Sequence, residues 1–170
     1  ARTIKKTKRP PTSLVFMIDV SGSMRASNKL ALVKQSVNLL VNELTEDDQV
    51  AVVAYANDAG LRLDSTSGSK HAEIMKVVNG LNAGGSTNGE GGIRTAYDTA
   101  VKHFIQGGSN RVIMCTDGDF NVGVNDDDEL VELIEEKAAS GVFLSIFGFG
   151  MGNLKAVSYT HLRAHETDTD

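Results

Sequence analysis

The chain has 170 residues, of which 41% are apolar and 23% are charged, with 17 lysines and arginines against 22 aspartates and glutamates. This length supports one domain with a substantial core, and the formal net charge of −5 argues against a nucleic-acid-binding protein. The single cysteine, Cys115, excludes an internal disulfide, and no apolar run approaches the roughly 20 residues of a membrane-spanning helix.

The N-terminal residues 1–12 contain the only basic cluster, ARTIKKTKRPP, which ends in a proline pair. We interpret this segment as a solvated leader or linker. A polybasic contact with a membrane surface is the alternative. Apart from that, we expect membrane association only through parts of the protein outside this chain.

Short apolar runs alternate with longer helical patterns along the remaining chain. Such runs, rich in β-branched residues, predict strands. They lie at 14–18, 50–55, 111–115 and 142–147, with a weaker run near 60–63.

Four helical patterns lie between these runs. The first follows Ser27, a predicted N-cap, and its apolar stripe comprises Leu30, Val33, Val37, Leu40 and Leu44. The second covers about 70–79. The third covers 89–104, with the stripe Ile93, Ala96, Tyr97, Ala100 and Phe104. The fourth begins in the acidic run at 125–129, where carboxylates suit the positive end of a helix dipole.

Strands that are apolar throughout, separated by helices, predict a mostly parallel sheet with helices on both faces. The fold class is therefore α/β, a doubly wound and Rossmann-like domain. In such sheets the ligand site lies outside the carboxyl ends of the strands, so we expect chemistry in the loops that follow them.

Oxygen-bearing side chains and glycines occur together in three of these loops. They are Asp19, Ser21 and Ser23 in DVSGS, Thr87 in GGSTNG, and Asp117 and Asp119 in TDGD. Oxygen ligands without histidine or cysteine suit Mg²⁺, Mn²⁺ or Ca²⁺ rather than zinc. Neutral hydroxyls leave such an ion electrophilic, with a water position that a carboxylate from another molecule can take.

Simpler interpretations account for some of these residues. Asp19 and the serines also suit a helix cap or a turn, and Asp119 suits a turn or a supporting role beside the site. The run from Asp117 resembles the start of an EF-hand loop, but Val122 occupies its required glycine position. The glycines at 148–153 do not match a dinucleotide-binding fingerprint, and Cys115 suits a small core residue.

The pentapeptide DVSGS resembles the D-x-S-x-S signature of the von Willebrand factor type A (vWA) domain and its metal-ion-dependent adhesion site, or MIDAS. GGSTNGEGGI and MCTDGDFNVG resemble the two other loops of that site, in the same order. The resemblance covers about residues 13–155 and extends to bacterial cell-envelope proteins, which implies a cell-envelope or periplasmic location. The metal ligands that it implies are Asp19, Ser21, Ser23, Thr87 and Asp117.

The C-terminal residues 156–170 include VSYTHLRAHET, which resembles a reading frame of a sequencing adapter. We therefore expect a vWA domain over 13–155 that lacks its last strand and helix, followed by a non-native tail. The strand at 142–147 would then be an exposed edge of the sheet.

The resemblance implies a protein-binding module in which a glutamate or aspartate of a protein partner completes the coordination of Mg²⁺, Mn²⁺ or Ca²⁺. We expect no catalysis. The alternative is a metal-dependent phosphoryl-transfer or hydrolytic enzyme, since α/β folds with strand-end aspartates also host those. Against it, Ser21 stands where such enzymes carry a second aspartate. A third interpretation is a scaffold that has lost metal binding.

Overall fold

The computed structural model describes most of the chain between residues 9 and 158. The described residues are 9–26, 29–56, 59–85, 89–116, 132, 135–136, 139–149 and 155–158. In this part of the chain, none of the helices is long and apolar enough to span a membrane.

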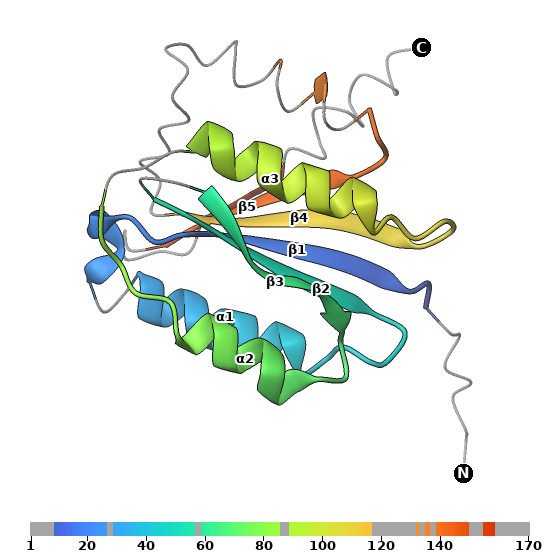
Figure 1. The fold of residues 1–170 in the computed structure, drawn as a ribbon, viewed down its shortest axis with the longest axis horizontal. Helices are drawn as coiled ribbons and strands as arrows, with labels where there is room; N and C mark the ends of the chain where they lie inside the picture. Colours follow the sequence, from blue (N-terminus) through green and yellow to red (C-terminus); the bar gives the residue numbers. More distant parts are fainter. Residues whose placement is uncertain are drawn as a thin grey trace.

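The described strands form one six-stranded sheet in the order β3-β2-β1-β4-β5-β6 (Figure 1). β1, β2, β4 and β5 run parallel, whereas β3 and β6 pair antiparallel with β2 and β5. This confirms the α/β fold and the mostly parallel sheet. The strands are β1 (Thr12–Asp19), β2 (Gln49–Tyr55), β3 (Ala59–Ser67), β4 (Ser109–Thr116), β5 (Phe143–Gly148) and β6 (Lys155–Ser158).

The helices cover both faces of the sheet (Figure 1). α1 (Leu30–Val41) and α2 (His71–Asn79) lie on one face, and α3 (Gly89–Lys102) lies on the other. A short 3₁₀ helix, η1 (Gly22–Arg25), follows β1. The fourth predicted helix, at 125–129 and beyond, lies outside the described residues except for isolated positions.

Side chains that alternate along the central strand β1 build two separate cores. Phe16 and Ile18 pack with α1 and α2, whereas Val15 and Met17 pack with α3. Gly92 lets α3 approach the sheet, because a Cβ there would lie 2.8 Å from Met17 Cε and 2.9 Å from Tyr55 Cγ. Burial on both faces explains why this strand is apolar throughout.

One member of the predicted α1 stripe is wrong. Leu40 is 38% exposed, and its neighbour Val41 is fully buried. On an α-helix, Val41 lies about 40° around the axis from Val37, whereas Leu40 lies about 60° from it in the other direction. The face that meets the sheet therefore continues through Val41. Leu44 is buried from the turn after the helix.

The expectation that the strand at 142–147 forms an exposed edge is also wrong. β6 pairs antiparallel with β5, from Gly148 opposite Lys155 to Ser145 opposite Ser158. The backbone N–H and C=O groups of an uncovered strand edge favour pairing with another segment, and residues 155–158 supply it here. These residues overlap the segment that we interpret as a non-native tail.

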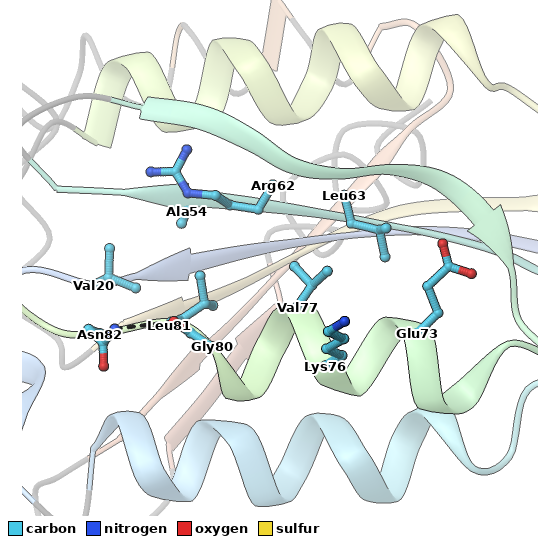
Figure 2. A pocket seen from close by; sticks show the side chains of 10 residues that line it. All are labelled: Val20, Ala54, Arg62, Leu63, Glu73, Lys76, Val77, Gly80, Leu81 and Asn82. Atoms are coloured by element: carbon cyan, nitrogen blue, oxygen red, sulfur yellow. Dashed lines mark hydrogen bonds between the residues drawn. The ribbon is translucent and has the colours of Figure 1, made fainter.

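A groove of about 630 Å³ lies between α2 and β3 (Figure 2). Its lining includes Val20, directly after β1, and Leu81, directly after the C-cap of α2. The groove therefore reaches the edge of the sheet at which the parallel strands end.

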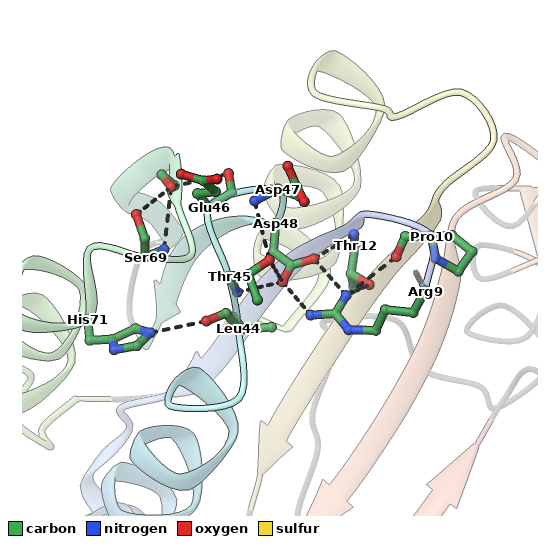
Figure 3. A network of polar contacts seen from close by, with 11 residues as sticks. Arg9, Pro10, Thr12, Leu44, Thr45, Glu46, Asp47, Asp48, Ser69 and His71 are labelled. Atoms are coloured by element: carbon green, nitrogen blue, oxygen red, sulfur yellow. Dashed lines mark hydrogen bonds and ion pairs between the residues drawn. The ribbon is translucent and has the colours of Figure 1, made fainter. Parts of the chain in front are cut away.

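At the opposite end of the sheet, where the parallel strands begin, the buried carboxylate of Asp48 binds the N-terminal segment (Figure 3). Asp48 accepts hydrogen bonds from both terminal nitrogens of Arg9, the Nη1–Oδ1 distance being 2.8 Å, and from the backbone N–H groups of Thr12 (2.9 Å) and Thr45 (2.8 Å). Residues 9–12, assigned to the leader from sequence, thus contact the domain, and β1 begins one residue before the predicted boundary.

Candidate metal centre

β1 places Asp19 at the end of the sheet where the parallel strands have their carboxyl ends. This strand lies between β2 and β4, with Asp19 opposite Tyr55 and Ile18 opposite Cys115. The Asp19 side chain is fully buried. Because neighbouring parallel strands finish at the same end of the sheet, the ends of β1 and β4 lie side by side here.

The loop after β1 brings Ser21 and Ser23 beside this carboxylate. The backbone N–H of Ser21 donates to Asp19 Oδ1 at 2.8 Å, and the Oγ atoms of Ser21 and Ser23 are 3.1 Å apart. Met24 is fully buried in the core and anchors the η1 turn, so that buried Ser21 and exposed Ser23 keep fixed positions. Three of the five predicted ligands therefore lie together.

The segment that leads to Thr87 is held against the same loop. The N–H of Gly84 donates to Val20 O at 2.7 Å, and the N–H of Gly22 donates to Gly85 O at 2.9 Å. Gly85 has a φ of +87°, a left-handed conformation that favours glycine. Thr87 itself lies outside the described residues.

The end of β4 also contacts Asp19. The hydroxyl of Thr116 donates to Asp19 Oδ2 at 3.5 Å, and the carbonyl of Thr116 accepts from the N–H of Phe149 at 2.9 Å. Asp117, the next residue, lies outside the described residues, as does Asp119. Thr116 was not among the predicted site residues, although its place at the end of an apolar strand is the kind of signal that selected Asp117.

The described donors fit a hard divalent cation. A buried carboxylate and two neighbouring hydroxyls supply oxygen only, the chemistry that Mg²⁺ prefers. Among the described residues there is no group of three or more histidine, cysteine, aspartate or glutamate side chains that could hold a metal. The DVSGS motif predicts a site that uses hydroxyls beside its carboxylates.

Cys115 does not contribute to this chemistry. Its side chain is buried, and burial raises the pKa of the thiol to about 12, so the reactive thiolate is scarce near neutral pH. The prediction of a small core residue is confirmed.

Comparison with known proteins identifies the family. The sequence model of the von Willebrand factor type A domain matches residues 14–119. The chain belongs to the von Willebrand factor type A domain family. vWA domains generally act as non-enzymatic interaction modules, often between proteins, and commonly bind a divalent metal.

The vWA domain has a bacterial relative in Escherichia coli (strain K12), the uncharacterized protein YfbK. The two are 46% identical over 153 residues, which cover 90% of this chain and 27% of the relative. The chain thus spans about a quarter of that protein's length.

Two solved structures show the same fold at lower identity. The conserved hypothetical protein BatB from Bacteroides thetaiotaomicron has a TM-score of 0.66 at 23% identity, covering 81% of this chain and 66% of that one. An aerotolerance-related membrane protein from Bacteroides fragilis has a TM-score of 0.63 at 20% identity, covering 89% and 83%.

Proposed function

We propose that this vWA domain is a divalent-cation-dependent binding module that takes an acidic side chain of a protein partner at its metal site. The observation that carries the proposal is the meeting of Asp19, Ser21 and Ser23 at the carboxyl edge of the sheet, with the two serine Oγ atoms 3.1 Å apart.

The proposed ligands are Asp19, Ser21, Ser23, Thr87 and Asp117, and the proposed ion is Mg²⁺, with Mn²⁺ or Ca²⁺ as substitutes. The contacts of Gly84 and Gly85 with the β1 loop, and of Thr116 with Asp19, support the inclusion of Thr87 and Asp117. When bound, the ion would supply an electrophilic position for a carboxylate. The protein's part is to hold hydroxyl and carboxylate oxygens at one fixed point.

The partner would contribute a glutamate or an aspartate. We place the protein in the cell envelope, which is supported by the likeness to an aerotolerance-related membrane protein. No catalytic step is assigned to the domain, because Ser21 stands where a metal-dependent phosphoryl-transfer enzyme would carry a second aspartate.

Binding of a carboxylate at the proposed site would be directly measurable with Mn²⁺. If Mn²⁺ binds to the chain, it should enhance the relaxation of water protons. Adding N-acetyl-glutamate amide should lower this enhancement in a saturable way, while N-acetyl-glutamine amide, which has nearly the same size but no charge, should not.

An Asp19→Ala variant serves as the control for the site and should bind no Mn²⁺ in the same range. The proposal fails if Mn²⁺ binding survives in this variant. It also fails if the glutamate and glutamine compounds act alike on the folded chain.

A further inference from the structure

The groove between α2 and β3 has an apolar floor. Leu63 of β3 and Val77 of α2 face each other across it, with Val20 and Leu81 at one end (Figure 2). Its volume of about 630 Å³ accommodates a few side chains of a bound peptide.

This groove is continuous with the candidate metal centre. Val20 lies between Asp19 and Ser21 in the chain, and its carbonyl accepts the N–H of Gly84. Leu81 begins the segment that runs to Gly84. A molecule bound at the serines would therefore have the groove beside it.

The rim of the groove carries more positive than negative charge. Its charged lining residues are Arg62 and Lys76, which are positive, and Glu73, which is negative (Figure 2). In the described part of the chain, the side chains of Arg62 and Lys76 form no hydrogen bond or ion pair. Both are exposed, so they are available to an anionic partner.

The Arg62 side chain points toward the end of the groove at Val20, which adjoins the candidate metal centre (Figure 2). Its Nη1 would lie 2.7 Å from a Cβ placed on Gly60, so the guanidinium lies against the start of β3. Gly60 pairs with Ala54 near the end of β2, and the next β2 residue, Tyr55, pairs with Asp19. The guanidinium is thus on the same edge of the sheet as the candidate ligands.

We propose that the groove binds the segment of the acidic partner that adjoins its metal-binding carboxylate. This inference rests on the proposed function. The segment is extended, places an apolar side chain over Val77 and Leu81, and presents a second carboxylate to Arg62. The apolar floor of the groove favours the apolar side chain, and the excess of positive charge at the rim favours the second carboxylate.

A capped peptide, acetyl-Glu-Ala-Leu-Asp-amide, tests this at saturating Mg²⁺ with the ¹⁵N-labelled chain. Titration should shift the backbone amide signals of Val77 and Leu81. An Arg62→Glu variant should bind the peptide about fivefold more weakly, since one exposed attraction becomes a repulsion. Lys102→Glu, which makes the same charge change on α3 across the sheet, should leave the affinity within twofold.

Three outcomes contradict the inference. If Mg²⁺ binds but the peptide shifts no groove amides, or if both charge reversals weaken the peptide equally, the groove has no such role and the proposed function stands. If the folded chain binds no Mg²⁺, the proposed function and this inference fail together.

Discussion

Asp19 and Asp48 are both fully buried aspartates, and they lie at opposite edges of the sheet. Asp48 precedes β2, and its oxygens are bonded to Arg9 and to backbone N–H groups, so its role is structural. Asp19 ends β1 and accepts hydrogen bonds beside a pair of serine hydroxyls. The surroundings, rather than the residue type, separate the structural carboxylate from the candidate ligand.

Acid should destabilise the domain partly through Asp48. The Arg9 side chain, helped by the backbone of Thr45 and Thr12, lowers the pKa of Asp48 from about 4 to about 2 although burial opposes the shift. This contribution, about 2 kcal/mol, is present above the ordinary pKa and is lost as pH falls toward 2. Urea unfolding between about pH 5 and pH 2 should therefore show a steeper loss for the native chain than for Asp48→Asn. Parallel curves would contradict this assignment.

Gly85 should be more sensitive to substitution than its neighbour Gly84. Alanine at Gly85 must adopt a φ of +87° and should cost about 1 kcal/mol of folding free energy. At Gly84, a Cβ would make only an ordinary contact, 3.6 Å from Arg25 Nη2. Thermal unfolding of the two variants compares them, and equal melting temperatures would show that the left-handed turn is not needed.

For individual residues, the sequence predicts the residue types of the site but not their contacts. Asp19, Ser21 and Ser23 follow from a strand that ends in oxygen-bearing residues, and the structure brings these three together. The hydrogen bond from the N–H of Gly84 to the carbonyl of Val20 joins residues 64 positions apart in sequence, which no local pattern predicts. The placement of Thr87 and Asp117 stays a prediction.

The packing of α3 on the sheet depends on the small size of Gly92. Valine at Gly92 would place side-chain atoms against Met17 and Tyr55. Overpacking of this kind should cost about 1–3 kcal/mol, measurable by urea unfolding. Leu39→Ser, at a side chain of α1 that is 70% exposed, is a control and should change stability by less than about 1 kcal/mol. A reversed order of the two effects would refute the packing described for α3.

The elements themselves were largely predictable, because apolar runs and helical stripes reflect burial on two faces of one sheet. The weak run at 60–63 belongs to β3, the longer antiparallel edge strand. The predicted Leu40 was wrong because periodicity alone does not distinguish it from Val41 at the helix end. The pairing of β6 was not predicted, because it depends on the uncovered edge of β5, which exists only once the sheet has assembled.

For the whole molecule, we propose binding rather than catalysis. The Asp19 region combines a carboxylate with neutral hydroxyls, and Ser21 takes the place of a second aspartate. With Mg²⁺ or Mn²⁺, generic phosphatase and esterase substrates should give no turnover above that of an Asp19→Ala control. Turnover that this variant abolishes would favour the enzyme alternative instead.

We propose that one divalent cation binds through Asp19 at the carboxyl end of the parallel strands. Calorimetry can measure this binding by titration of Mg²⁺ into the native chain and into the variants Asp19→Asn and Asp64→Asn. Asp64 is an exposed aspartate of β3, so its variant controls for the lost charge. We predict one saturable site that Asp19→Asn loses and Asp64→Asn keeps. If the folded native chain binds no Mg²⁺, or if both variants bind it equally, Asp19 is not a ligand of such an ion.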